Sequence, residues 1–401
     1  MANRKKIAVI CTMGFRHSHV DVIVPKFITG FPTDEGLIPP QVEISSLYID
    51  QVHDDDVIMA FAKNHDIPIF RSIRSALTLG GHHWRPSDEL LAVDGVLLIA
   101  EHGDYGQNEK DQTLYPKRSF FEQICGVFAR SGKSAPVFCD KYLSYDWPTA
   151  KWMYDRAQQL NVPFMAGSSL PLCYRKPWLE YEIGVHLDQA VSIGWHQLES
   201  YGYHALELLQ CMVERRAGGE VGIAAVQCLE GDAVWQAGRD GLWSQDLVKA
   251  ADDCTAAKNP GQMEDNCPNP AVFLLEYADG FRAATLMLTG HLKGWGFAGL
   301  CNGQIQATEV LQFDAPYPNP HFSYLGLNIE QMFLTGQPQY PVERTLLVSG
   351  VLDALLESRH QGHKRIETPH LRFTYEPRAT SPIRPMGTKP TGAAAMERTF
   401  D

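Results

Sequence analysis

The chain has 401 residues, of which 44% are hydrophobic and 20% charged, and a formal charge of -12 at pH 7. This length suits about two domains with sizeable cores, and the negative charge argues against nucleic acid or an anionic membrane as the main partner. No apolar run reaches the roughly 18 residues that a membrane-spanning helix needs. Nine cysteines without a CxxC pair indicate reduced thiols, a cytoplasmic location and no cysteine-based zinc site.

Short apolar runs alternate with helical stretches over the first 170 residues. These runs show little alternation, which is typical of strands buried on both faces of a parallel sheet. The expected strands are 6–11, 42–50, 68–70, 93–100, 136–140 and 163–167, and the expected helices are 20–29, 57–64, 119–131 and 147–160. The sequence therefore predicts a Rossmann-like, doubly wound α/β domain over residues 1–170.

Longer strands and tight turns characterise residues 171–376. The segments YADGF (277–281) and LCNGQ (300–304) place Asp-Gly and Asn-Gly between apolar runs, which is a strong hairpin signal. The expected strands are 191–196, 222–230, 271–277, 281–290, 295–301 and 304–313, and the expected helices are 203–216 and 342–360. We predict an α+β domain with a large open, mainly antiparallel sheet.

Two further segments and the sheet face complete this picture. The polar stretch 242–270 is expected to cross the surface, and the Pro- and Gly-containing residues 377–401 are expected to form an extended or disordered tail. The open sheet face must be covered, which predicts a homodimer or homotetramer.

Three segments resemble parts of one known family. Residues 131–170 resemble its strand, Glu-Lys-Pro turn, helix and strand, with Asp140-Lys141-Tyr142 at the turn. Residues 200–209, SYGYHALELL, are similar to its Asp-x-Gly-x-His segment, and residues 341–367 to its closing helix and strand. In this order they resemble the glucose–fructose oxidoreductase / inositol dehydrogenase (Gfo/Idh/MocA) family. The resemblance implies NAD(P)-dependent hydride transfer on a hydroxyl of a sugar, glycoside or cyclitol.

Lys141 and His204 are the expected catalytic residues. Lys141 follows a buried strand at the carboxyl edge of a parallel sheet, where ligands collect. The resemblance implies that it reaches both the nicotinamide and the substrate hydroxyl. Desolvation beside a cofactor can lower the pKa of a lysine and let it move protons. His204 corresponds to the family's acid/base, and imidazole titrates near neutral pH. The family's partner aspartate is replaced by Ser200 and its proline by Tyr142.

The turn after the first strand holds the place of a dinucleotide-binding loop but lacks its glycines. The residues at the glycine positions and between them are Cys11, Met13, Gly14, Phe15 and Arg16. Methionine at such a position crowds a phosphate, whereas Arg16 supplies a positive charge. Asp50 ends the second expected strand, where a ribose-binding carboxylate belongs. NAD or NADP is therefore expected at an atypical site.

Histidines and carboxylates gather at the same sheet edge. Glu101 and His102 follow the fourth strand and are expected to lie under the cofactor, and His17 and His19 follow the first. Imidazole and carboxylate groups bind divalent ions such as Zn²⁺ or Mn²⁺, so His17, His19 and His102 are candidate metal ligands. Scattered polar residues are the alternative. The candidate substrate-binding residues are Tyr142, Arg175, Ser200, Glu207, Glu230, Asp232 and Trp235, since acidic and aromatic side chains suit sugars.

Three functions remain open at this point. The first is hydride transfer on a carbohydrate-like substrate. The second is cleavage of a glycosidic bond on the same fold, without net redox and with or without a metal, which is suggested by the missing glycines and by Ser200 and Tyr142. The third is a non-catalytic descendant that serves as a binding or partner subunit.

Overall fold

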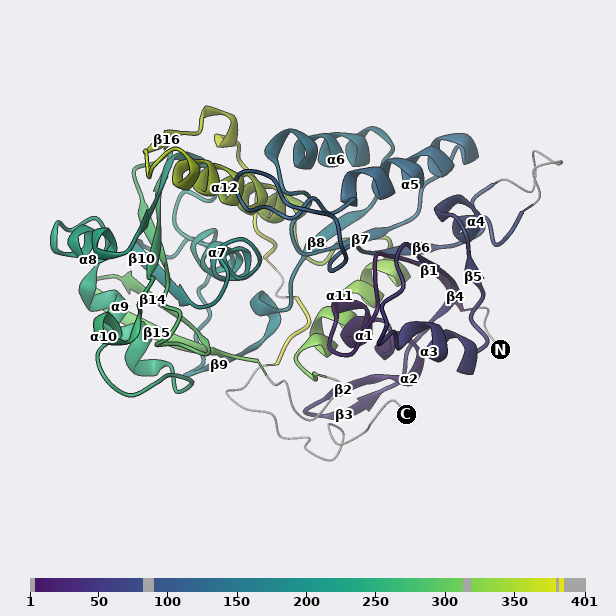
Figure 1. Cartoon of the computed structure of the whole chain (residues 1–401), viewed down its shortest axis with the longest axis horizontal. Helices are drawn as coiled ribbons and strands as arrows, with labels where there is room; N and C mark the ends of the chain where they lie inside the picture. The colour runs from purple at the N-terminus through teal and green to yellow at the C-terminus, as the bar shows by residue number, and fades with distance from the viewer. Residues whose placement is uncertain (1–3, 82–89, 313–318, 380–381, 386–401) are drawn as a thin grey trace.

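The computed structural model describes residues 4–81, 90–312, 319–379 and 382–385, and most of the predicted tail lies outside them. Two sheets lie at opposite ends of an elongated molecule (Figure 1). The first sheet has the order β5-β4-β1-β6-β7-β8, and every strand pair in it is parallel. Its strands are β1 (Lys5–Cys11), β4 (Val42–Ile49), β5 (Ile69–Phe70), β6 (Gly95–Ile99), β7 (Val137–Asp140) and β8 (Phe164–Gly167). The predicted doubly wound sheet is confirmed.

Helices cover both faces of this sheet (Figure 1). Neighbouring residues of β1 point to opposite cores: Ala8 and Ile10 pack in one, Ile7 and Val9 in the other. The first core contains α4 (Ile73–Leu77), α5 (Lys117–Ser131) and α6 (Trp147–Gln159), and the second contains α1 (His19–Ile23), α3 (Ile58–Asn64) and α11 (Phe322–Thr335). This layering explains why the strands read as continuous apolar runs.

Three features of this domain differ from the sequence expectation. The helix expected over 20–29 is divided into α1 and α2 (Lys26–Thr29) at Pro25, because proline lacks the N–H that a continuous helix needs. The following loop contains a small hairpin of β2 (Phe31–Thr33) and β3 (Gly36–Ile38). Helix α11, which is not among the expected elements, returns from the C-terminal part of the chain to cover the first sheet.

The second sheet has the order β16-β11-β12-β13-β10-β14-β15-β9, with one parallel pair, β10 and β13. Its strands are β9 (Tyr174–Lys176), β10 (Leu187–Gly194), β11 (Ile223–Glu230), β12 (Ala271–Tyr277), β13 (Arg282–Met287), β14 (Trp295–Cys301), β15 (Gln304–Leu311) and β16 (Ile366–Glu367). Both predicted hairpins are present, β12 with β13 and β14 with β15. The predicted α+β domain with a mainly antiparallel sheet is confirmed.

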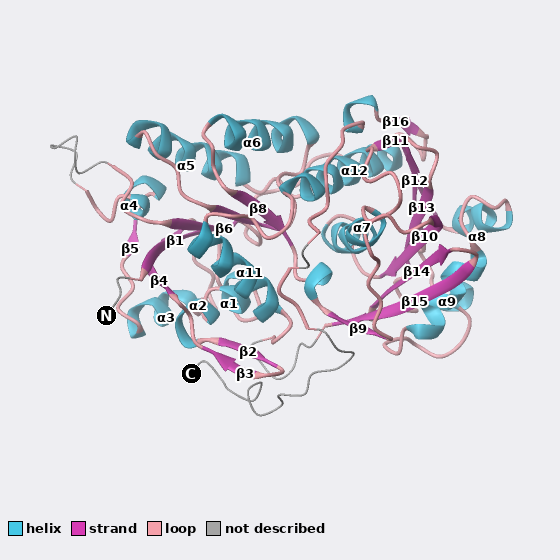
Figure 2. Ribbon diagram, turned by 180° about the vertical axis from the view of Figure 1, so that it is seen from behind, coloured by secondary structure: helices cyan, strands magenta, loops and turns pink. Residues whose placement is uncertain are grey.

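The faces of the second sheet are both covered within the chain (Figure 2). Helices α7 (Ser200–Val213) and α12 (Val342–His360) pack on one face. On the other, α8 (Asp232–Arg239) and α9 (Gln245–Cys254) pack against the strands, and α10 (Met263–Asn266) follows them. The stretch 242–270 thus contributes a helical layer, which corrects its interpretation as a surface crossing. The sheet face that was expected to need a second copy is covered by α8 and α9.

None of the helices in the described part of the chain combines the length and the hydropathy that crossing a membrane requires.

Candidate active site

A cavity of about 540 Å³ lies between the two sheets, at the carboxyl edge of the parallel one. Loops that follow β1, β6 and β7 supply one side of it, and α7 and β14 supply the other. Its lining includes His17, His19, Glu101, His102, Thr113, Tyr115, Lys141, Trp195, Glu199, Ser200, Tyr201, His204, Trp295 and His321. The structure therefore brings together both predicted catalytic residues and all three predicted metal ligands.

Lys141 lies where β7 ends, in an unusual backbone conformation. Its φ is 59°, and His17 and His102 around the same cavity have φ values of 66° and 68°. Left-handed backbone at residues other than glycine costs about 1–3 kcal/mol and is concentrated at functional sites. The Lys141 ammonium group lies 3.2 Å from Glu101 Oε2.

The charge of Lys141 follows from its neighbours. Burial alone lowers its pKa, but the charges of Glu101 and Asp140 outweigh that effect, so the pKa of Lys141 is raised. The direction is therefore opposite to the expected lowering: the raised pKa of Lys141 favours its protonated form. Such a group donates a hydrogen bond or a proton but does not accept one.

A second buried lysine, which sequence reasoning missed, holds Glu101 in place. Lys117 begins α5, and its ammonium group donates to Glu101 Oε1 at 2.5 Å and to the carbonyl groups of Asp140 and Tyr142 at 2.9 and 2.8 Å. Burial on its own raises the pKa of Glu101. The charges of Lys117 and Lys141 outweigh this effect and lower the pKa to about 2. Glu101 is thus an ionised carboxylate that links two lysines and orients Lys141.

His204 lies on the opposite side of the cavity, near the N-terminus of α7. Its ring is 5.9 Å from that of Trp295 and 5.8 Å from that of Tyr203. Burial and, second to it, the charge of Lys141 hold the pKa of His204 well below its usual value. Its Nδ1 is buried and has no hydrogen-bond partner among the described residues. His204 therefore presents a neutral imidazole close to a cation.

Glu199, next to Ser200, is not free to replace the family's aspartate. Its carboxylate accepts hydrogen bonds from the backbone and hydroxyl of Thr113, at 3.0 and 3.2 Å, and from the Tyr142 hydroxyl at 3.1 Å. Tyr142 is itself buried beneath the cavity, 1% exposed. Its hydroxyl supports Glu199, which corrects its interpretation as a substrate contact, whereas Ser200 does line the cavity.

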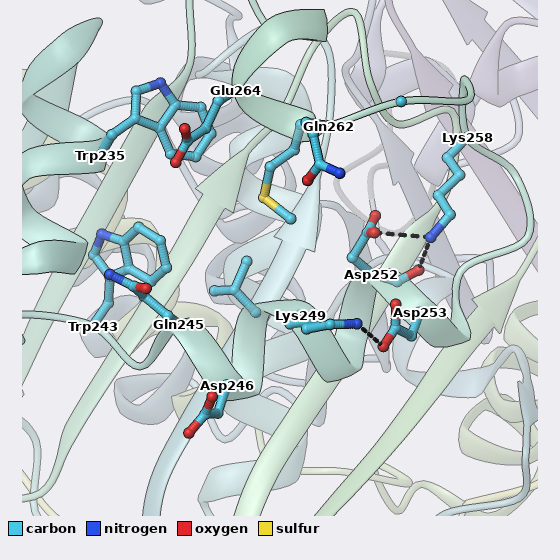
Figure 3. Close-up of a pocket in the computed structure, with 13 residues that line it drawn as sticks. Trp235, Trp243, Gln245, Asp246, Lys249, Asp252, Asp253, Lys258, Gln262 and Glu264 are labelled. Carbon is cyan, nitrogen blue, oxygen red and sulfur yellow. Dashed lines mark hydrogen bonds and ion pairs between the residues drawn. The ribbon is translucent and has the colours of Figure 1, made fainter.

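Several predicted substrate-binding residues lie elsewhere. Arg175 pairs with Glu180 at 2.5 Å, and Glu230 pairs with Arg359 at 3.0 Å. Trp235 lines a separate cavity of about 500 Å³ beside α8, α9 and α10 (Figure 3). Asp232 begins α8, on the same outer layer. The sequence indicated that these four residues lie near strand ends. It did not indicate whether a given strand end lies beside the cavity or on the far side of the sheet.

Glu207 faces away from the cavity, although it lies one helical turn after His204. Its carboxylate accepts from the backbone N–H of Ser168 at 3.0 Å and from the Ser168 hydroxyl at 2.5 Å. Burial raises the pKa of Glu207 from 4.5 to about 7. It therefore connects α7 to the segment after β8, and it is not among the residues that line the cavity.

The raised pKa of Glu207 predicts a pH-dependent stability. The folded protein holds this proton more tightly than the unfolded chain, so its contribution is complete below pH 4.5 and is lost as the pH rises towards 7. Relative to Glu207→Gln, the wild type is expected to lose up to about 3 kcal/mol over this window. Denaturant unfolding of both proteins at several pH values measures the difference. A difference that stays constant with pH contradicts the prediction.

The N-terminus of α1, where a diphosphate is expected, is capped by the chain itself. Ser18 Oγ accepts from the backbone N–H groups of Asp21 and Phe15, and Asp21 Oδ2 accepts from the N–H of His17 at 2.7 Å. The Asp21 carboxylate also adds a negative charge close to these donors. A Cβ at Gly14 would lie 2.6 Å from Ile58 Cγ2, so this glycine is required by packing.

The other turn residues contact protein groups. The buried Cys11 thiol donates to the Tyr48 carbonyl at 3.3 Å, and the Phe15 ring lies 4.8 Å from His53 and 5.1 Å from His102. Arg16 is exposed, and Met13 is partly buried. Neither belongs to the lining of the cavity.

Side chains also connect the loops on both sides of β1. The Asp50 carboxylate accepts from the hydroxyls of Tyr48 and Tyr105, at 2.7 and 2.8 Å. The Gln51 side chain bonds the backbone of Asp104 twice, at 2.9 and 3.1 Å. Because β1 lies between β4 and β6, these contacts cross the end of β1, over which a dinucleotide would lie.

The regions expected to hold the two halves of a nicotinamide dinucleotide thus differ in how well they fit it. The capped turn and the bridging loops do not fit a diphosphate and ribose held on a glycine loop. The cavity beside Lys141 and His204 has the size and the polar groups that suit a nicotinamide ring or a polyol. The orphaned Nδ1 of His204 and Nε2 of His102 are polar atoms without a protein partner among the described residues.

The three candidate metal ligands line the cavity. Within the described ranges, no group of three or more His, Cys, Asp and Glu side chains is placed to hold a metal ion. His19 Nδ1 is engaged by Asp140 at 2.5 Å, and the His102 ring packs 5.6 Å from that of His19. Burial lowers the pKa of His102 to about 3. The expectation of a Zn²⁺ or Mn²⁺ site receives no support.

Comparisons with known proteins find the same fold in solved structures. No family model matches the sequence, and no curated protein matches it. GenD2 from gentamicin A biosynthesis, solved in complex with NAD, is 13% identical, with a TM-score of 0.56 over 92% of this chain and 97% of that chain. The scyllo-inositol dehydrogenase from Lactobacillus casei, solved with NAD(H) and scyllo-inositol, is 11% identical, with a TM-score of 0.54 over 91% and 99%.

The myo-inositol 2-dehydrogenase from Lactobacillus plantarum is similar to the same extent, at 11% identity and a TM-score of 0.54 over 91% and 99% of the two chains. At these identities the likeness shows the fold. The resemblance of the three sequence segments is confirmed at that level: this chain has the two-domain fold of the Gfo/Idh/MocA-type inositol and sugar dehydrogenases.

Proposed function

We propose that the chain is an oxidoreductase that acts on a hydroxyl group of a sugar, glycoside or cyclitol bound in the cavity between the two sheets. The observation that carries this proposal is that a cation, Lys141, and a neutral imidazole, His204, line one cavity of about 540 Å³. Aromatic rings of Trp195, Tyr201 and Trp295 line it as well. Such rings suit the apolar faces of a polyol ring.

The two catalytic residues have different roles in this proposal. Lys141, held by Glu101, donates a hydrogen bond to the reacting oxygen and stabilises negative charge on it. His204 accepts the proton of the same hydroxyl, because its Nδ1 carries no partner among the described residues. NAD or NADP is the proposed hydride acceptor, on the support of the fold shared with dehydrogenases solved with NAD. It would have to be held without a glycine loop, because Ser18 and Asp21 cap the turn after β1.

The capped turn after β1 favours a second candidate function. A cation and a base in one polar cavity also suit cleavage of a glycosidic bond without net redox, which needs proton transfer but no hydride acceptor. The hydrogen bonds of Ser18 and Asp21 to the backbone donors of this turn are the specific observation that supports it.

Binding of nicotinamide cofactors separates these functions. We expect saturable binding of one equivalent of NADH or NADPH in calorimetric titration of the purified chain, and reduction of NAD or NADP with a panel of cyclitols and sugars. Absence of binding for all four cofactor forms rules out the oxidoreductase. Release of nitrophenol from nitrophenyl glycosides without added cofactor then supports the second function, and the variant His204→Gln shows whether the same cavity is responsible.

A further inference from the structure

The cavity contains a histidine–carboxylate pair that the proposed roles of Lys141 and His204 do not use. His19 Nδ1 lies 2.5 Å from Oδ2 of Asp140. His19 is the first residue of α1, and Asp140 is the last residue of β7. The pair therefore joins two loops at the carboxyl edge of the parallel sheet, and its histidine lines the cavity.

We propose that His19 and Asp140 form a catalytic dyad, in which Asp140 orients the imidazole and His19 presents Nε2 to the substrate as a base. The proposal rests on the proposed function in one respect, namely that the cavity is an active site. In the reaction, the O–H bond of a second substrate hydroxyl, not the one assigned to His204, breaks, an Nε2–H bond forms, and the electron pair of the broken bond stays on the oxygen. Asp140 remains ionised and stabilises the imidazolium through Nδ1–H.

The hydrogen bond determines which nitrogen carries the proton. An ionised carboxylate only accepts, so the imidazole donates from Nδ1 and Nε2 keeps its lone pair. The Asp140 side chain is completely buried, and its Oδ1 has no hydrogen-bond partner among the described residues. The bond to His19 is thus the side-chain contact that the structure records for this carboxylate.

Several ionisable side chains surround the pair. The buried carboxylate of Glu101 is paired with the ammonium groups of Lys117 and Lys141, whereas the side-chain partner of the Asp140 carboxylate is His19. Imidazole rings of His102 and His204 face the same region. The contact with Asp140 thus orients the imidazole so that Nε2 is the nitrogen that can act as a base.

Packing holds the ring in this orientation. The His19 ring lies 5.7 Å from that of Phe322 in an edge-to-face arrangement and 5.6 Å from that of His102. The side chain remains 14% exposed. With Nδ1 turned to Asp140, the ring nitrogen left for the cavity is Nε2. The dyad thus approaches a bound substrate from the side of the first sheet, opposite to His204.

Acylation with diethyl pyrocarbonate tests the dyad without a known substrate, because the reagent modifies unprotonated, accessible imidazole nitrogens. The full chain is treated, and modified histidines are located by peptide fragmentation, with His186, 66% exposed, as the internal reference. We expect Asp140→Asn to slow acylation of His19 more than tenfold and to leave His186 unchanged, since an asparagine amide donates to Nδ1 and moves the proton to Nε2. Equal rates in both proteins overturn the proposal.

A spectroscopic measurement on the unmutated protein covers the case in which Asp140→Asn does not fold. In ¹⁵N-histidine spectra, an Nδ1–H tautomer of His19 supports the dyad, and an Nε2–H tautomer overturns it. The resonance is assigned with His19→Gln. A stoichiometric divalent metal that is lost in His19→Gln also overturns it, because the histidine is then a metal ligand.

Steady-state kinetics connects the dyad to turnover. With any substrate that the wild type converts, His19→Gln and Asp140→Asn are expected to lower kcat at least 100-fold and to change KM less than threefold. The control His186→Gln keeps the wild-type values. If kcat is unaffected, the dyad is not catalytic. If the wild type converts no sugar, cyclitol or glycoside, the proposed function fails, while acylation and the tautomer still decide whether an oriented base is present.

Discussion

Replacing Lys141 with methionine is expected to lower kcat by a factor of about 10²–10⁴, the range that a positioned acid or base contributes. The change removes the cation that faces His204 across the cavity and keeps most of the apolar stem of the side chain. Glu101 retains its bond to Lys117 at 2.5 Å, so the fold is expected to persist. Steady-state kinetics, together with the unfolding midpoint, measures both effects.

The matched control for this variant is Lys151→Met. Lys151 lies on α6, and its side chain is 42% exposed and paired with Asp155 one turn along the helix. Exposed pairs of this kind contribute little to stability, so both kcat and the unfolding midpoint are expected to stay at the wild-type values. A Lys141→Met enzyme within threefold of the wild-type kcat contradicts the role of Lys141 in the reaction.

Replacing Lys117 with methionine is expected to lower the free energy of unfolding by about 3–5 kcal/mol, the range for removing one partner of a buried ion pair. The side chain is 1% exposed, and three acceptors lose their donor at once. Because Lys117 connects Glu101 to the loop after β7, Lys141 also loses its orientation, and kcat is expected to fall in the molecules that remain folded.

Denaturant unfolding of Lys117→Met and Lys133→Met distinguishes the loss of a buried ion pair from the mere loss of one positive charge. Lys133 is exposed just beyond the end of α5, and its replacement is expected to change the free energy of unfolding by less than about 0.5 kcal/mol. A loss below about 1 kcal/mol in Lys117→Met would show that Glu101 is stabilised sufficiently by Lys141 alone.

The strands of the first sheet could be predicted from the sequence because the apolar runs that indicate them are local. The five apolar runs before residue 141 and the run at 163–167 all correspond to strands of the sheet. The position of Lys141 after β7 followed from the same pattern. The broken helix at Pro25 was missed, although the proline is a local signal.

The residues that contact the site residues could not be predicted from the sequence, because they are distant from them along the chain. Lys117 resembles any lysine in the first turn of a helix, and only packing shows that it reaches Glu101. Glu207 lies one turn from His204, yet its carboxylate accepts a hydrogen bond from Ser168, outside the cavity. His19 and Asp140 are 121 positions apart, and no local pattern connects them.

The sequence by itself determined most of the segments that form the two sheets, and it made Lys141 and His204 candidates for one site. It did not predict β9, and it placed the start of β10 at residue 191, whereas the strand begins at Leu187. Hydrophobic periodicity and turn residues depend on near neighbours, so they can be recognised in the sequence. The tertiary structure alone decided the charge of Lys141, the capping of the turn after β1, the covering of the second sheet by α8 and α9, and the pairing of His19 with Asp140. Burial and ion pairing arise from segments that meet only when the chain folds.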